Sequence, residues 1–175
     1  HNAQTTHLRA IKSMFSFAHR NGLPASPARD LKGLSSDSAV VERNLSASEV
    51  AQLFAGLTEG RDRLLAQTMY FLGLRIAELE GILLDVDQFV PHDADTFHVL
   101  VNGKGGKKRR LTAPKALVQA LMAIPRHSKQ ADNAVFQSRY GRRLSLRRAS
   151  GIIKEGVRSS AIAAGVSAHW LRHSH

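Results

Sequence analysis

The sequence predicts a mostly helical α+β fold with one small antiparallel β-sheet. In most segments of the 175-residue chain, apolar residues recur three and four positions apart, which is the spacing of an amphipathic helix. Residues 96–112 differ, because apolar and polar residues alternate there around a glycine-rich centre, as they do in a β-hairpin.

Residues 4–20 are expected to form the first helix, and Gly22 suits the left-handed position that follows a helix. Its apolar face would consist of Leu8, Ile11, Phe15 and Ala18. Residues 34–44 are rich in small and polar residues, a composition typical of a linker. We therefore predict a domain boundary there, with residues 1–33 before it and residues 45–175 after it.

Three helices are expected after the linker. Ser46 and Glu49 have the spacing of a capping box, which predicts a helix start. The buried stripe of that helix would be Val50, Leu53, Phe54 and Leu57. A second helix is expected over residues 61–72, ended by Gly73, and a third begins near Leu74. The third would bury Ile76, Leu79 and Leu83.

A hairpin and further helices follow. Residues 96–101 and 108–112 are predicted strands, and residues 102–106 can form only a turn. Pro114 suits the first turn of the next helix, whose core face would be Leu117, Leu121 and Ile124. Two more helices are then expected. One is capped by Ser145, runs through Ala164 and is ended by Gly165; the other is capped by Ser167 and begins at His169.

Composition points to a polyanionic partner. Hydrophobic residues make up 43% of the chain, enough for a packed core, while the formal net charge is +11. An isoelectric point near 10.9 is typical of proteins that bind nucleic acid, although a soluble protein can be basic for other reasons. The chain has no Cys, which excludes disulfides and thiolate chemistry and fits a reducing cytoplasm. No apolar run approaches the roughly 20 residues that span a bilayer, so no membrane partner is expected.

Three short motifs carry the candidate chemistry. In residues 73–79, Arg75 lies among apolar residues, and Glu78 three positions later could hold it. The alternative is a plain ion pair on a helix surface. In residues 103–110, five of the eight residues are Lys or Arg on a glycine-flanked turn, which suits contact with a polyanion. A solvated charge run or a localisation signal is the alternative.

The third motif is residues 169–173, where His169 and Arg172 share a helical face. His169 and His173 also have the spacing of a two-histidine metal site, but no carboxylate with the zinc-protease pattern supplies a third ligand. His175 is either a native residue or part of a purification tag.

A basic scaffold with two arginines, a lysine and a histidine suits chemistry at a phosphodiester. Guanidinium groups bind phosphate oxygens in pairs, and Lys or His can protonate a leaving oxygen. We see no cluster of carboxylates suited to two metal ions, which disfavours a metal-dependent nuclease and leaves no cofactor expected.

The three motifs, in this order, resemble those of the tyrosine recombinase or phage integrase family. The family pattern G-L-R-x-x-E-L stands at residues 73–79, G-K-G-x-K at residues 103–107 and H-x-L-R-H at residues 169–173. The resemblance implies an integrase-like catalytic domain at residues 45–175, incomplete at its C-terminus. Residues 1–33 would then be the C-terminal part of a helical, SAM-like core-binding domain.

The resemblance also implies roles for single residues. Arg75 and Arg172 would clamp the scissile phosphate, Lys104 would protonate the leaving 5′ oxygen, His169 would assist proton movement, and Glu78 would hold Arg75. Lys107 is the second choice for the hairpin lysine. The candidate DNA contacts are Lys107, Lys108, Arg109, Arg110, Arg142 and Arg143.

The family nucleophile is a tyrosine downstream of the H-x-L-R-H motif. The only tyrosines here, Tyr70 and Tyr140, both precede that motif and match no nucleophile position. We therefore expect the nucleophile to lie beyond residue 175, and we expect the 175 residues alone to bind DNA without cleaving it.

The predicted partner is double-stranded DNA, bound by a homo-tetramer on paired sites when the protein is full length. The predicted setting is the nucleoid of a prokaryotic cytoplasm, with a phage or mobile-element origin. A non-catalytic DNA-binding protein that reuses the fold is the main alternative, and an RNA-binding protein is a weaker one, because aromatic residues total only 6%. The DNA target, and whether the reaction integrates, excises or resolves DNA, stay open.

Overall fold

A computed structural model describes residues 2–22, 28, 31, 44–79, 81–82, 88–103, 106–125, 133–162 and 165–175. The chain divides into two compact units, residues 1–42 and residues 43–175. This division falls inside the predicted linker. The assignment of residues 1–33 to a core-binding domain remains a prediction.

The first unit contains one described helix, α1 (Asn2–Arg20). Gly22 follows it with a φ of 88°, in the left-handed region that the sequence predicted. Ile11, Met14 and Phe17 are exposed large apolar side chains on this helix.

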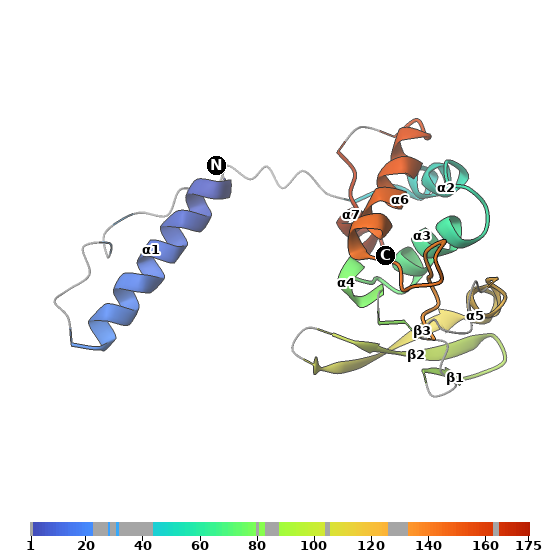
Figure 1. Cartoon of the computed structure of the whole chain (residues 1–175), viewed down its shortest axis with the longest axis horizontal. Helices are drawn as coiled ribbons and strands as arrows, with labels where there is room; N and C mark the ends of the chain where they lie inside the picture. Colours follow the sequence, from blue (N-terminus) through green and yellow to red (C-terminus); the bar gives the residue numbers. More distant parts are fainter. Residues whose placement is uncertain are drawn as a thin grey trace. The chain divides into compact units, whose positions relative to one another are not determined.

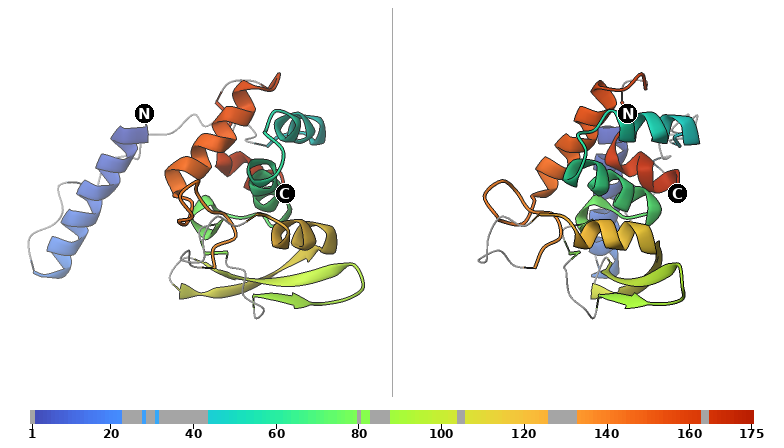
Figure 2. Two further views of the ribbon diagram at one scale, coloured as in Figure 1. Left: turned by 45° about the vertical axis from the view of Figure 1, so that its right-hand side comes forward. Right: turned by 90° about the vertical axis from the view of Figure 1, so that its right-hand side faces the viewer.

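The second unit contains six described helices and a three-stranded antiparallel sheet, so the predicted mostly helical α+β fold class is confirmed. In chain order its elements are α2 (Ala47–Ala55), α3 (Arg61–Phe71), α4 (Ile76–Leu79), β1 (Phe89–Pro91), β2 (Thr96–Asn102), β3 (Lys108–Pro114), α5 (Lys115–Met122), α6 (Leu146–Arg158) and α7 (Ala168–His173). The helices α2 to α7 of this unit lie on one side of the sheet, with α5 next to it (Figures 1 and 2).

The sheet has the order β1-β2-β3, and its register decides which side chains meet the helices. Val101 pairs with Arg109 and Val99 pairs with Leu111. Opposed residues of an antiparallel pair point to the same face, and Val99 and Val101 are buried. Arg109 therefore projects from the buried face of the sheet.

Buried apolar side chains from all the longer helices of the second unit form one core with that sheet face. Its largest fully buried members include Leu53, Leu65, Met69, Val99, Val118, Ile152 and Leu171. The segment that ends α2 packs tightly on α6 at Gly156, where an added Cβ would lie 2.7 Å from the Leu57 Cγ.

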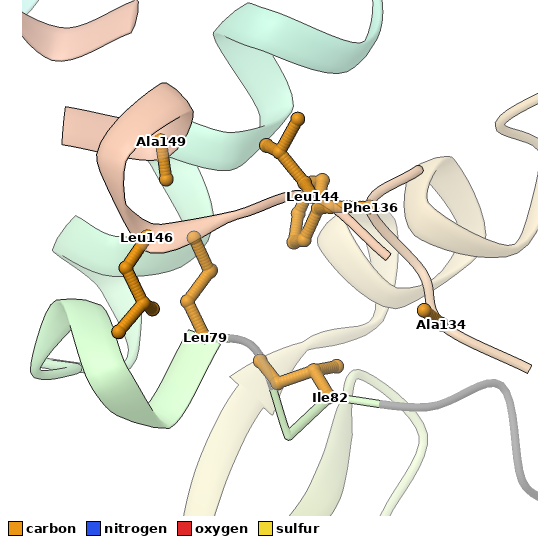
Figure 3. A pocket seen from close by; sticks show the side chains of 7 residues that line it. All are labelled: Leu79, Ile82, Ala134, Phe136, Leu144, Leu146 and Ala149. Carbon is orange, nitrogen blue, oxygen red and sulfur yellow. The ribbon is translucent and has the colours of Figure 1, made fainter. Parts of the chain in front are cut away.

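Packing around a small apolar pocket holds the short helix α4 in place. Leu79 at the end of α4 and Ile82 just after it face the segment 134–144 and the start of α6 (Figure 3). The other residues that line the pocket are Ala134, Phe136, Leu144, Leu146 and Ala149. Because Glu78 immediately precedes Leu79, this packing also sets the position of Glu78.

The structure differs from several expectations at the ends of elements. The helix predicted from Leu74 is a single turn, and Leu83 lies outside the described residues. Helix α6 ends at Arg158, before the predicted Ala164, because the Ser159 backbone caps it and the Ser160 hydroxyl donates to the Val157 carbonyl.

Two helix starts also shift by a residue. Pro114 occupies the N-cap position of α5, outside its first turn, since Pro114 is still paired in β3. Helix α7 begins at Ala168, and Ser167 occupies its N-cap position without a side-chain capping hydrogen bond. Strand β1 was not predicted, because three residues are too few to display an alternating pattern. Within the described ranges, the structure contains no helix of the length and apolarity that crossing a membrane requires.

Candidate active site

Glu78 is the centre of a charged cluster at the start of α4. Its side chain is only 4% exposed. The Glu78 carboxylate accepts hydrogen bonds from the Arg75 backbone N–H at 2.8 Å and from Arg75 Nη1 at 3.1 Å. A carboxylate that reaches back three residues to the first free N–H of a helix is one half of a capping box. The burial of Glu78 excludes the simple surface ion pair that was the alternative for this motif.

Two more arginines reach the same carboxylate from distant parts of the chain. Arg109 Nη2, on β3, lies 2.8 Å from Glu78 Oε2, and Arg172 Nη1, on α7, lies 3.5 Å from the same oxygen. Three guanidinium groups from three elements therefore converge on one buried carboxylate.

The Gly73 carbonyl is a second shared acceptor. Arg172 Nη1 donates to it, and Arg109 Nη2 lies 3.5 Å from it. Gly73 has a φ of 53°, in the left-handed region where α3 ends, and a Cβ there would lie 2.9 Å from the His175 imidazole. Glycine thus suits the left-handed turn, and a larger residue there would also displace the His175 ring.

The cluster carries an excess of positive charge that is open to solvent. The side chains of Arg75, Arg109 and Arg172 are 50%, 33% and 24% exposed. Burial, followed by the charges of Arg75 and Arg109, lowers the pKa of Arg172, and the Glu78 carboxylate opposes this shift. An anion that approaches this surface would relieve the repulsion among the three guanidinium groups.

The structure brings together Arg75, Glu78 and Arg172 from two of the sequence motifs. His169 is exposed on α7, with its ring 4.5 Å from the His173 ring. Lys104 lies outside the described residues. Gly103, which precedes it, is close to the cluster, because a Cβ there would lie 3.8 Å from Glu78 Oε1.

The predicted DNA contacts occupy two different environments. Lys107, Lys108, Arg110 and Arg142 are exposed, and Arg143 is half-buried. Arg109, which the sequence analysis assigned only to DNA contact, instead has its guanidinium in the Glu78 cluster. The sequence does contain a signal for this: Arg109, Leu111 and Ala113 alternate along β3 and so share one face.

The two tyrosines occupy different positions in the second unit. The Tyr70 ring, on α3, packs edge-on against Phe54 and Phe71, with centroid distances of 6.0 Å and 5.3 Å. Tyr140 is exposed in a turn, and the Arg139 guanidinium lies 4.7 Å from its ring centroid. For the part of the chain that the structure covers, no group of three or more His, Asp or Glu residues is placed to hold a metal ion.

Comparison with known proteins agrees with this fold and these motifs. Residues 43–175 match the model of the phage integrase family. Tyrosine recombinase XerC of Shewanella sp. (strain ANA-3) is 32% identical over 179 residues, a match that covers 95% of this chain and 56% of that protein. Tyrosine recombinase XerD of Mycobacterium tuberculosis (strain CDC 1551 / Oshkosh) is 30% identical over 183 residues, covering 95% and 57%. The chain thus spans just over half the length of these relatives.

Solved structures share the fold at lower identity. A lambda integrase dimer bound to a COC′ core site aligns with a TM-score of 0.69 and 16% identity, over 94% of this chain and 48% of that one. The Tn1549 transposon integrase in complex with circular intermediate DNA aligns with a TM-score of 0.68 and 17% identity, over 97% and 63%. The fold is therefore that of DNA integrase structures.

The family match covers most of the chain, and it includes all the elements that form the arginine cluster. The chain belongs to the phage integrase family, and its curated relatives are tyrosine recombinases.

Proposed function

We propose that the protein that carries this chain is a site-specific tyrosine recombinase, which breaks and rejoins double-stranded DNA. The observation that supports this most directly is the convergence of Arg75 and Arg172 on the buried Glu78, since these residues belong to two separate family motifs. The net charge of +11 is consistent with a DNA partner.

In the proposed reaction, a tyrosine hydroxyl attacks the scissile phosphorus. A bond forms between phosphorus and the tyrosine oxygen, and the bond from phosphorus to the 5′ oxygen breaks, which leaves a 3′-phosphotyrosyl intermediate. Arg75 and Arg172 would bind the non-bridging oxygens and stabilise the charge that develops there. Glu78 would hold these guanidinium groups in position.

Proton transfer completes the proposed step. Lys104 would give a proton to the leaving 5′ oxygen, and His169 would assist proton movement and phosphate binding. Because the phosphotyrosyl bond conserves the energy of the broken phosphodiester, rejoining would need neither a high-energy cofactor nor a metal ion. The exposed Lys107, Lys108, Arg110 and Arg142 would contact the DNA backbone.

We also propose that a polypeptide of these 175 residues binds DNA without cleaving it. Tyr70 is packed among aromatic rings and Tyr140 stacks against Arg139, so neither hydroxyl is assigned the nucleophilic role. The complete protein would act in the cytoplasm, as a homo-tetramer on paired sites. A solved lambda integrase tetramer is bound to a Holliday junction, which is consistent with this assembly.

The test uses the complete natural protein. Its DNA site is first selected from random duplexes by binding, and the protein is then mixed with a labelled, nicked duplex of that site, which traps covalent adducts. We expect a labelled protein–DNA adduct on a denaturing gel, and its absence would refute recombinase activity.

Variants then separate the enzyme from a DNA-binding protein that only reuses the fold. Arg75→Ala should lower adduct formation by roughly 10²-fold or more while it weakens DNA binding only modestly. Arg158→Ala is the matched control, since it removes the same charge from the end of α6 that lies near α2. If Arg75→Ala changes only affinity, the non-catalytic alternative holds.

A further inference from the structure

We propose that Arg109 is a positioning residue. Through Glu78, it ties the hairpin that carries Lys104 to Arg75 and Arg172, which together we call the arginine clamp. This inference rests on the proposed function, because it assumes that Lys104 is the proton donor. Arg109 lies on β3, whereas Arg75 and Arg172 lie at the start of α4 and on α7.

The register of the sheet requires Arg109 to point inward. Arg109 opposes Val101, which is 1% exposed, whereas its neighbour Arg110 opposes Leu100 on the other face of the strand pair. An arginine on the buried face needs an acceptor there, because an unpaired buried charge is costly. Glu78 supplies that acceptor at 2.8 Å.

Arg109 also shares both of its acceptors with the clamp. The Gly73 carbonyl accepts hydrogen bonds from Arg109 and from Arg172, and Glu78 Oε2 forms ion pairs with both. The strand β3 and the helix α7 are therefore held against the same two acceptors, in the segment from Gly73 to Glu78. The guanidinium, with several donors in a fixed plane, can hold two acceptors on different residues in one geometry.

The hairpin is closed immediately beside this contact. The Gly103 N–H donates to the Lys107 carbonyl at 2.7 Å, and a Cβ added at Gly103 would lie 3.8 Å from Glu78 Oε1. Arg109 on β3 thus binds one oxygen of the Glu78 carboxylate, and Gly103, just after β2, lies on the side of the other oxygen. Glu78, which holds the phosphate-binding arginines, would in this way also fix the base of the hairpin that carries Lys104, the proposed proton donor.

A leaving-group substitution tests this role. When the scissile 5′ oxygen is replaced by sulfur, the thiolate leaves without a proton, so a defect in proton donation disappears. In the complete natural protein on saturating nicked DNA, we expect Arg109→Gln to slow adduct formation by about 10- to 100-fold with the oxygen substrate. With the sulfur substrate, we expect it to slow the reaction by less than about 3-fold, since the phosphate clamp remains.

The matched control is Arg110→Gln, the same substitution one residue along the strand on its opposite face. It should change adduct formation on the two substrates equally. Lys104→Ala should show the same sulfur rescue as Arg109→Gln, and Arg75→Ala should remain slow on both substrates. Arg109→Lys keeps the charge beside Glu78 if Arg109→Gln fails to fold, and it should show a smaller loss that sulfur also rescues.

Different failures lead to different conclusions. If Arg109→Gln slows adduct formation equally on both substrates, or on neither, Arg109 does not act through the hairpin and the inference is overturned. Where Arg109→Gln is unfolded, the same criterion applies to Arg109→Lys. If Lys104→Ala gains nothing from sulfur, Lys104 is not the proton donor and the inference falls with that assignment. If the unmodified protein forms no adduct on either substrate, the proposed function itself is refuted.

Discussion

Glu78 is a carboxylate that the fold buries together with the donors that compensate its charge. Removing that charge leaves three guanidinium groups facing one another without a counter-ion. The cost is limited by solvent, because the three arginine side chains remain partly exposed.

We predict that Glu78→Gln lowers the free energy of unfolding of the 175-residue chain by about 1–3 kcal/mol, from lost charged hydrogen bonds and unbalanced repulsion. Urea unfolding followed by circular dichroism measures this. Glu59→Gln is the control, because Glu59 pairs with Arg63 on the surface, and its loss should cost less than about 0.5 kcal/mol. Equal effects of the two substitutions would contradict the central role of Glu78.

His98 on β2 provides a prediction about pH. Burial, then the charges of His92 and Arg110, lowers the pKa of His98, while Asp93 opposes the shift. The unfolded chain therefore binds this proton more readily than the folded chain does. Stability should fall as the pH drops below about 6.5, the ordinary histidine pKa, and continue to fall until the lowered folded-state pKa is passed.

We expect His98→Gln to reduce this loss of thermal stability between about pH 7 and pH 5, since the pH dependence comes from the imidazole. His7→Gln, at an exposed position on α1, should leave the pH dependence unchanged. If the thermal stability of His98→Gln and of the unsubstituted chain falls equally as the pH drops, the His98 imidazole is not the source of the pH dependence.

At the scale of elements, α2 and α6 pack at a distance that only glycine allows. An added Cβ at Gly156 would lie 2.7 Å and 2.9 Å from two carbons of Leu57, and one added at Gly56 would lie 2.7 Å from the Gly156 carbonyl oxygen. The absence of a side chain at both positions allows the end of α2 to approach α6 this closely.

We predict that Gly156→Ala destabilises the chain by about 1–3 kcal/mol through overpacking, despite the higher helix propensity of alanine. Gly151→Ala on the same helix is the matched control, because its nearest neighbour would be Arg148 Nη1 at 3.9 Å. That substitution should stabilise by roughly 0.5–1 kcal/mol, the gain in helix propensity. Thermal unfolding of both variants decides this, and a stabilising Gly156→Ala would contradict the packing.

At the scale of the whole molecule, charge dominates the expected behaviour. The net charge of +11 should make duplex binding depend steeply on salt, because each neutralised phosphate releases counter-ions. With about six to ten phosphate contacts, affinity should fall by roughly 10³- to 10⁵-fold between 50 mM and 200 mM salt.

Fluorescence anisotropy of a labelled duplex over a salt series measures this dependence. Arg142→Ala should reduce the slope of the logarithmic plot by about one. Arg63→Ala should leave the slope unchanged, since Arg63 is paired with Glu59. A shallow slope for the unsubstituted chain would argue against a phosphate-dominated interface.

Features encoded locally could be predicted from the sequence. The Ser46–Glu49 capping box is present, and the hairpin strands follow the alternating pattern, because in both cases neighbouring residues determine the geometry. The fold class followed from these local signals together with the family motifs.

Features set by distant contacts could not be predicted in the same way. The pairing of Arg109 with Glu78 joins residues 31 apart, and the contact of Arg172 with Gly73 joins residues 99 apart. The end of α6 depends on serine hydrogen bonds that compete with helix continuation. Propensity and spacing carry little information about such contacts.

The contact between Gly73 and Arg172 has a consequence for how the chain matures. Ribosomes release a protein from its N-terminus, so Glu78 and its glycine turn emerge well before Arg172. Before α7 emerges, a nascent chain holds only two of the three arginines around Glu78. The arginine cluster is therefore completed only after α7 has been synthesised and has docked against the turn at Gly73.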